Sequence, residues 1–360
     1  MVPQPVPQSH PTPWNGAMGG IVKAHRGWVI VIGGLCALGW SAESLRAQES
    51  GKEASRVHVV ITDAALNLEK DLPPLQASDL TVKLGKQQAQ ITRLVPAQGE
   101  NAALQLMILI DDTLGTSIGG NLQEVKDFIK AQPPTTVVGV AYSSNTTIQL
   151  AQNFTNDHDK AAEAVRLPRG SLSSMDSPYL SLIQLVKSWP QQKVRRMVLM
   201  VSDGIDRLHG ERPQAVMAGR GSLGGPRAIG TTYHSMPTMS ADADQASEVA
   251  QRYNVVVSSL YAVGIGRAGR SSWDLQIGLS GLTQLADETG GECYSLSTSQ
   301  AVSFKPYLDQ YQKLLNNQYY LEFEPTPGKK GSLQRVKIST QAKNSEILAP
   351  DNVWVPGVAQ

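Results

Sequence analysis

The chain has 360 residues, a net charge of +1 at neutral pH, 41% hydrophobic residues and 18% charged residues. This length and apolar content suffice for one large folded domain with a smaller one beside it. The balanced charge, without any block of Lys and Arg in the sequence, argues against nucleic acid as a main partner, because phosphate binding needs clustered cations.

Residues 1–47 have the pattern of a targeting segment. Lys23 and Arg26 precede an apolar run at residues 27–40, and small and polar residues follow it. A secretory signal has this order, with a basic region before a short hydrophobic core. The run is shorter than the roughly 20 residues of a membrane-spanning helix. We expect a signal peptide or, alternatively, an uncleaved membrane anchor, and a secreted or periplasmic location for the rest of the chain.

Residues 55–100 are expected to form a small β segment. Val57, Val59 and Ile61 alternate with polar or smaller residues, as in a strand with one buried face. Further strands are expected at residues 80–84 and 90–94. The tail at residues 317–357 has the same character, with strands expected at residues 319–324, 333–340 and 353–355. We predict that the two segments pair to form one discontinuous accessory domain, because the two ends of a domain are often close together.

Residues 101–316 alternate between apolar runs and amphipathic stretches. This alternation predicts an α/β domain with a doubly wound, mostly parallel central sheet. Strands are expected at residues 104–110, 136–142, 147–154, 194–201, 254–263 and 292–296. Helices are expected at residues 121–132, 157–167, 178–189, 242–252, 275–289 and 301–316. The short turn at Ser144 and Asn145 predicts that the strands on either side of it form an antiparallel pair.

A long stretch at residues 205–240 interrupts this alternation. It is rich in Gly, Pro, Ser and Arg and has no periodicity. Such a loop is uncommon inside a compact domain and tends to be functional or disordered. Two interpretations stay open, namely a flexible insertion without a function and a loop that determines specificity or acts as a lid. His209 and His234 lie in this loop at a spacing that does not indicate a zinc site.

Oxygen-bearing side chains follow two of the predicted strands. Asp111 and Thr113 come directly after the strand at residues 104–110, and Asp203 follows the strand at residues 194–201. Ligands of open α/β sheets bind beyond the carboxyl ends of the strands, so we expect these side chains to converge. An all-oxygen set suits Mg²⁺, Mn²⁺ or Ca²⁺ and does not suit zinc.

Ser171 and Ser173, in a polar loop, are the nearest further hydroxyl groups. The candidate metal ligands are therefore Asp111, Thr113, Asp203, Ser171 and Ser173, with Mg²⁺ or another divalent cation as the cofactor. In the alternative interpretation no metal binds, and the two aspartates cap turns and helix starts by accepting hydrogen bonds from backbone N–H groups.

Four segments occur in a recognisable order along the chain: LMILIDDT, MVLMVSDGID, LTQLADETGGECYSL and LLNNQYYLEFEP. Together they resemble a von Willebrand factor A domain, of the type found in acidobacterial secreted proteins. The resemblance covers nearly everything after Arg56. It implies a Rossmann-like α/β fold and a protein that binds a protein partner through a metal-ion-dependent adhesion site.

The sequence departs from the adhesion-site motif of that family. The motif reads Asp-x-Ser-x-Ser, followed by a distant Thr and then an Asp. Here Asp111, Thr113 and Gly115 stand at the first three positions, so one hydroxyl is replaced and one is missing. The distant Thr has no counterpart, whereas Asp203 matches the last carboxylate. The resemblance therefore implies a degenerate site, and a metal-free structural or scaffold module is the main alternative.

The sequence gives little support to an enzyme. A phosphatase with Asp111 as its nucleophile would need a second Asp two residues later, where Thr113 stands. A serine hydrolase would carry G-x-S-x-G directly after a strand, whereas the one such match, at residues 115–119, is separated by four residues from the strand expected at residues 104–110. The glycines at 264 and 266 lack the third glycine of a dinucleotide fingerprint. We expect a binding protein without catalytic activity.

Overall fold

The computed structural model describes residues 56–65, 74–170, 176–190, 192–209, 240–263, 272–296, 298–325 and 330–357. Residues 50–360 form one compact unit. The predicted targeting segment at residues 1–47 and most of the loop predicted at residues 205–240 lie outside the described residues.

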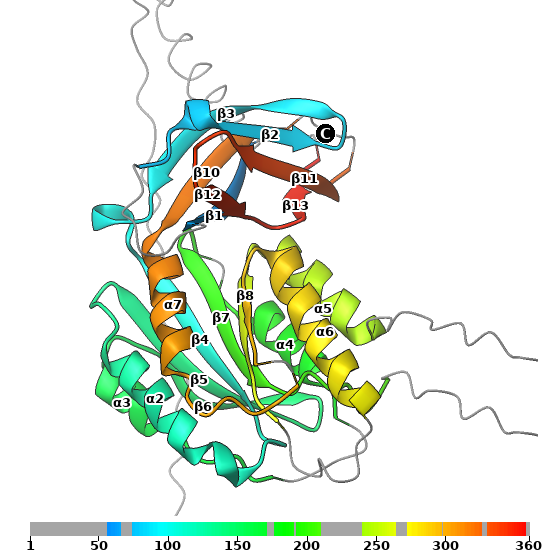
Figure 1. Cartoon of the computed structure of the whole chain (residues 1–360). Helices are drawn as coiled ribbons and strands as arrows, with labels where there is room; N and C mark the ends of the chain where they lie inside the picture. Colours follow the sequence, from blue (N-terminus) through cyan, green and yellow to red (C-terminus); the bar gives the residue numbers. More distant parts are fainter. Residues whose placement is uncertain are drawn as a thin grey trace, which may run out of the picture. The chain divides into compact units, whose positions relative to one another are not determined.

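A six-stranded sheet lies at the centre of this unit (Figure 1). Its strands are, in spatial order, β6 (Thr147–Thr155), β5 (Thr136–Ser144), β4 (Leu104–Asp111), β7 (Arg195–Ser202), β8 (Val256–Tyr261) and β9 (Cys293–Tyr294). All neighbours are parallel except β6, which runs antiparallel to β5. The predicted mostly parallel α/β sheet and its one antiparallel pair are confirmed.

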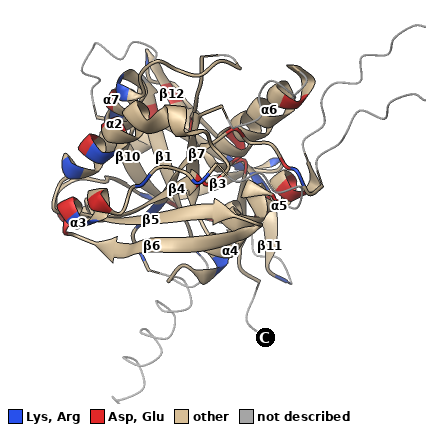
Figure 2. Ribbon diagram, turned by 90° about the horizontal axis from the view of Figure 1, so that it is seen from below, with Lys and Arg blue, Asp and Glu red and all other residues tan. Residues whose placement is uncertain are grey.

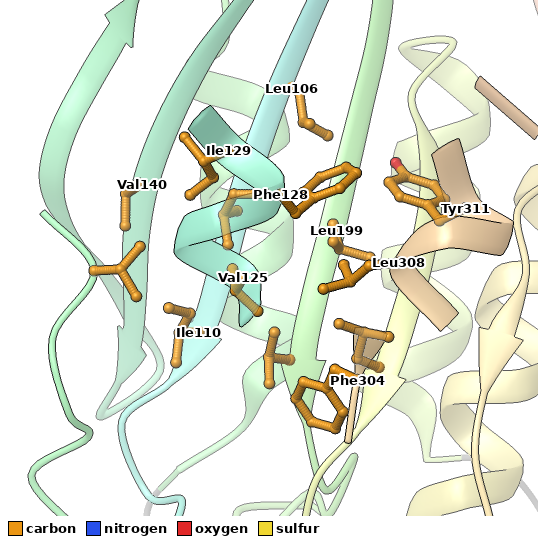
Figure 3. Close-up of a cluster of buried hydrophobic side chains, with 14 of the residues drawn as sticks. Leu106, Ile110, Val125, Phe128, Ile129, Val140, Leu199, Phe304, Leu308 and Tyr311 are labelled. Atoms are coloured by element: carbon orange, nitrogen blue, oxygen red, sulfur yellow. The ribbon is translucent and has the colours of Figure 1, made fainter. Parts of the chain in front are cut away.

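Helices cover both faces of this sheet. They are α2 (Gly119–Lys130), α3 (His158–Glu163) and α7 (Lys305–Asn316) on one face, and α4 (Pro178–Ser188), α5 (Ala241–Arg252) and α6 (Ser272–Thr289) on the other. Successive side chains of β4 point to opposite faces, so Ile108 joins the first cluster of buried side chains and Leu109 joins the second. Figure 3 shows the first cluster, in which Phe128 of α2 and Tyr311 of α7 are close.

Helix α3 is shorter than the predicted helix at residues 157–167. It begins as expected, because Asp157 Oδ1 accepts the N–H of Lys160 at 3.0 Å. It ends at Glu163 because the next residues are held elsewhere. The hydroxyl of Tyr142 accepts the N–H of Arg166 at 2.6 Å, and the Arg166 guanidinium lies 3.8 Å from the centre of the Tyr142 ring. Tertiary contacts therefore override the local helical pattern.

The second sheet is antiparallel and has seven strands. Its strands are, in spatial order, β12 (Ser345–Leu348), β1 (Val57–Ala65), β10 (Gln318–Glu324), β3 (Gln87–Pro96), β2 (Leu80–Leu84), β11 (Ser332–Thr340) and β13 (Asn352–Val355). Strands from residues 55–100 lie beside strands from residues 317–357 at four places in this order, and these neighbours are hydrogen-bonded to one another. The description of this sheet as a separate accessory domain stays a prediction. Short 3₁₀ helices lie at Ala77–Asp79, Gly99–Asn101 and Thr116–Ile118.

Strand β1 is buried on both faces, and the prediction of a single buried face was wrong. Val59 and Ile61 pack into the core of the antiparallel sheet, whereas Val60 packs into the cluster shared with α2 and α7. The reason is that helix α7 contacts β1 directly. A local pattern cannot show this contact, because α7 and β1 are far apart in the sequence.

A buried arginine at the start of β7 joins the two sheets. Nη1 of Arg195 donates to the carbonyl of Leu315 at 2.8 Å and to Oε1 of Gln318 at 2.9 Å, and Nη2 donates to the carbonyl of Ala102 at 2.6 Å. Gln318 belongs to β10 of the antiparallel sheet. The amino edge of the parallel sheet is thereby hydrogen-bonded to the antiparallel sheet.

Among the residues that the structure describes, no helix combines the length and the apolarity that a membrane crossing requires.

Candidate functional site

The carboxyl edge of the parallel sheet contains a switch point. From β4 the chain passes to β5 on one side, and it later returns to β7 on the other side of β4. Clefts for ligands form at such positions because the two connections diverge. Asp111 is the last residue of β4 and Asp203 follows the last residue of β7. Figure 2 views the protein from below, and acidic and basic ribbon segments meet there near β7.

Asp111 is fully buried, and both oxygens of its carboxylate accept hydrogen bonds. Oδ1 accepts the N–H of Thr113 at 2.9 Å and its hydroxyl at 2.7 Å. Oδ2 accepts the hydroxyl of Ser202 at 2.8 Å. Burial and, next, the negative charge of Asp203 raise the pKa of Asp111 to about 6, against the opposing influence of Arg207 and Thr113. The two carboxylates that the sequence singled out are therefore brought together.

The Asp203 carboxylate is buried and engaged on both oxygens. Oδ1 accepts the N–H of Ile205 at 3.0 Å, and Oδ2 accepts from Nη2 of Arg207 at 2.9 Å. The chain turns sharply at Gly204, where φ is +69°. A Cβ at this position would lie 2.2 Å from the carbonyl oxygen of Gly278 in α6. Only glycine at position 204 permits both this conformation and this close approach.

Arg207 supplies positive charge to the two carboxylates. Its side chain is only 11% exposed. Burial lowers its pKa, but the charges of Asp203, Asp111 and Asp176 outweigh burial and raise it. The sequence analysis missed this residue. Arg207 stands four residues after Asp203, but this spacing predicts a side-chain contact only within a helix. The two residues lie in a loop after β7, so the sequence alone could not predict their ion pair.

Asp112 has a different role from Asp111. Its oxygens accept from Nη1 and Nη2 of Arg166 at 2.7 and 3.1 Å, and Oδ1 also accepts the N–H of Arg169 at 2.9 Å. Burial works to raise the pKa of Asp112, but the hydrogen bonds and charges of the two arginines together lower it. The backbone carbonyl of Asp112 accepts the N–H of Gly170 at 3.0 Å. Asp112 thus positions the segment that leads toward Ser171.

Three of the five predicted metal ligands lie within the described residues. The structure places Asp111, Thr113 and Asp203 at one edge, while Ser171 and Ser173 lie outside the described residues. The hydroxyl of Ser202, which the sequence analysis did not consider, takes a place beside Asp111.

The oxygen donors of this site suit Mg²⁺, Mn²⁺ or Ca²⁺ by type. Two observations limit how an ion could bind to them. The Thr113 hydroxyl is directed at Asp111, and Asp203 Oδ2 is paired with Arg207. A cation would therefore compete with the Arg207 guanidinium for the same carboxylate.

Comparison with known proteins finds solved structures that the chain is similar to, three of which are 10–12% identical to it in sequence. No protein-family model matches the chain, and no curated protein matches it. A von Willebrand factor type A structure from Catenulispora acidiphila is 11% identical, with 84% of this chain and 74% of that chain covered and a TM-score of 0.38. An aerotolerance-related membrane protein from Bacteroides fragilis is 12% identical, with 59% and 99% covered and a TM-score of 0.38.

A pilus adhesin, SpaC from Lactobacillus rhamnosus GG, is 10% identical, with 82% of this chain and 47% of that chain covered and a TM-score of 0.37. Matches at this identity and TM-score carry no argument about function. The predicted resemblance to von Willebrand factor A domains is confirmed, because structures described as such domains are among those that the chain is similar to.

Proposed function

We propose that this chain is a protein-binding module of the von Willebrand factor A type that meets its partner at the carboxyl edge of the six-stranded sheet. The observation that carries the proposal is the buried group of Asp111, Asp203 and Arg207 at the switch point of that sheet. Burying charged side chains costs free energy of folding. Ionisable groups with shifted pKa values cluster at functional sites.

We propose further that a divalent cation and Arg207 are alternative occupants of this group. Asp111, Thr113 and Asp203 would hold Mg²⁺ once the guanidinium leaves Asp203. A bound divalent ion would supply an open coordination position for an oxygen of the partner, such as a carboxylate. The residues themselves fix the arrangement, because Ser202 orients Asp111 and the Gly204 turn orients Asp203.

The alternative is a metal-free module in which Arg207 never leaves. Its support is the low exposure of Arg207 and its second hydrogen bond, from Nη1 to the carbonyl of Ile205 at 3.2 Å. In this alternative the guanidinium neutralises the carboxylates permanently. We do not propose catalysis, because Thr113 stands where a phosphatase would need its second aspartate.

We assign the antiparallel sheet the role of an accessory domain. It is hydrogen-bonded to the amino edge through Arg195, so the opposite edge is left for the partner. The targeting segment predicted at residues 1–47 supports a location outside the cytoplasm. That location is part of the proposal.

Photo-crosslinking tests the proposed binding edge. A photo-reactive amino acid is placed at the exposed Ser117, which follows β4, or at the exposed Lys86, in the turn between β2 and β3. In cells that produce the protein, we expect a protein adduct at position 117 and none at position 86. The same adducts at both positions, or none at position 117, would contradict the proposal.

Thermal unfolding in MgCl₂ or EDTA tests the competition between the cation and Arg207. We expect Arg207→Gln to gain a larger Mg²⁺-dependent rise in Tm than the wild type, because the competing cation is gone. Adding Asp111→Asn should remove that rise. Arg169→Gln is the matched control, since this arginine faces Asp112 instead. If Mg²⁺ changes neither the wild type nor Arg207→Gln, the metal-free alternative stands.

A further inference from the structure

A second group of possible metal ligands lies close to the first site but uses different residues. Asp206, His209 and Asp242 each offer one ligand atom, and these atoms all lie within 4.8 Å of one another. Nδ1 of His209 is 3.1 and 3.0 Å from the two carboxylate oxygens of Asp242. Asp206 and His209 follow β7, whereas Asp242 lies in the first turn of α5.

The carboxylate of Asp206 is buried, and its two oxygens differ in their hydrogen bonding within the described residues. The residue is only 8% exposed. Oδ1 accepts the N–H groups of Leu208 at 3.0 Å and His209 at 2.9 Å, which fixes the carboxylate in place. Oδ2 is buried and has no hydrogen-bond partner among the described residues. A buried oxygen without a hydrogen-bond partner is destabilising, so such groups in folded proteins usually face an ordered water or an ion.

The Ser240 hydroxyl lies near Asp206 but makes no hydrogen bond to this Oδ2. Ser240 lies near enough to lower the pKa of Asp206, although burial has the larger and opposite influence and raises it. Its Oγ also accepts the N–H of Ala243 at 3.2 Å as the N-cap of α5.

We propose that Asp206, His209 and Asp242 bind a divalent transition-metal ion, with Zn²⁺ as the best fit. Imidazole nitrogen favours Zn²⁺ over Mg²⁺ and Ca²⁺, which prefer oxygen throughout. Two carboxylates and one neutral imidazole balance the charge of a divalent ion. Three protein ligands leave the fourth tetrahedral position open to water or to a ligand from outside.

The geometry allows an ion to enter with small movements. Zinc bonds to nitrogen and oxygen are about 2 Å long, so ligand atoms around one ion stand slightly more than 3 Å apart. The His209–Asp242 separations already have this length. The His209 side chain is 55% exposed, which gives the ion access from solvent. The bound ion would tie together the two chain ends that flank residues 210–239.

Isothermal titration of the full-length protein with ZnCl₂, after removal of metal by a chelator, tests this inference. We expect one zinc ion to bind to the wild type. His209→Ala and Asp206→Asn should each weaken binding more than about tenfold, since even the loss of an outer-shell partner often costs that much. Asp206→Asn keeps the oxygen that accepts the two N–H groups. Circular dichroism would verify that both variants are folded.

Two controls make the test specific. His58→Ala removes an exposed histidine that faces a single carboxylate, Glu322, at 3.3 Å, and it should leave zinc binding unchanged. Asp111→Asn, in the first site, should also leave it unchanged, which separates this inference from the proposed function. No zinc binding to the wild type, or equal binding to the wild type, His209→Ala and Asp206→Asn, would overturn the inference.

Discussion

The two edges of the parallel sheet each contain a buried arginine, and the two arginines have opposite surroundings. Arg195, at the amino edge, donates to neutral oxygens, and burial lowers its pKa. Arg207, at the carboxyl edge, lies among three aspartates whose charges raise its pKa despite burial. At the amino edge, Arg195 hydrogen-bonds the parallel sheet to the antiparallel sheet. The carboxyl edge concentrates charge, as expected where a ligand is met.

The largest effect should come from closing the space at the carboxyl edge. Gly204→Ala would force a Cβ against α6 at a positive φ. We expect a loss of about 3–5 kcal/mol in the free energy of unfolding, from left-handed strain and overpacking together. Gly85→Ala is the matched control, because its φ is +56° and nothing lies within 4 Å of the added atom.

Denaturant unfolding of both glycine variants checks this prediction. Gly85→Ala should lose only about 1–2 kcal/mol, which is the cost of the backbone conformation alone. Equal losses in the two variants would show that the close approach to α6 contributes nothing. The carboxyl edge would then be less tightly packed than the structure indicates.

Breaking the amino edge should have the next largest effect. Arg195→Leu removes donors from three oxygen atoms, two of them in buried hydrogen bonds, and we expect a loss of about 2–4 kcal/mol in the free energy of unfolding. Because the substitution lies at the opposite edge, the Mg²⁺ response of the Arg207→Gln variant should persist when the two changes are combined. Arg335→Gln, on the exposed side of β11, should change stability by less than about 0.5 kcal/mol.

A similar unfolding free energy for Arg195→Leu and the wild type would mean that the joint between the sheets does not depend on this arginine. Loss of the Mg²⁺ response in the combined Arg195→Leu and Arg207→Gln variant would mean that the two edges are coupled, whereas we expect them to be independent.

The smallest effect concerns Asp112, which is charged but structural. Asp112→Asn should cost about 1–2 kcal/mol at neutral pH, from weakened charge-assisted hydrogen bonds to Arg166. The folded pKa of Asp112 is lower than its unfolded value. Its contribution is therefore present above the unfolded pKa and is lost as the pH falls through the folded pKa. We expect the wild type and Asp112→Asn to converge in stability in acid.

Unfolding free energies measured from neutral to acid pH check this expectation. A difference between the two proteins that stays constant down to the lowest pH would contradict it. Asp112→Asn should not change Mg²⁺ binding by the Arg207→Gln variant, because Asp112 faces the arginines of the neighbouring segment and not Asp203.

Much of the fold could be predicted from local patterns. The apolar run of β4 and the spacing of Leu122, Val125 and Phe128 in α2 have the periods of a buried strand and an amphipathic helix. The prediction for α3 was too long because Tyr142 and Asp112 hold Arg166, and those residues are distant in sequence. Strand β12 was not predicted, since its sequence SEIL has two polar residues followed by two apolar ones and therefore no alternation.

The sequence by itself determined the α/β alternation and the positions of Asp111 and Asp203 at strand ends, because these features depend on neighbouring residues along the chain. Only the tertiary structure decided which charges meet. It brought Ser202 to Asp111 across 91 positions and His209 to Asp242 across 33, and it set Arg207 against the carboxylates. The physical reason is that the partners of a buried charge are fixed by strand order and crossovers, and local periodicity carries no record of either.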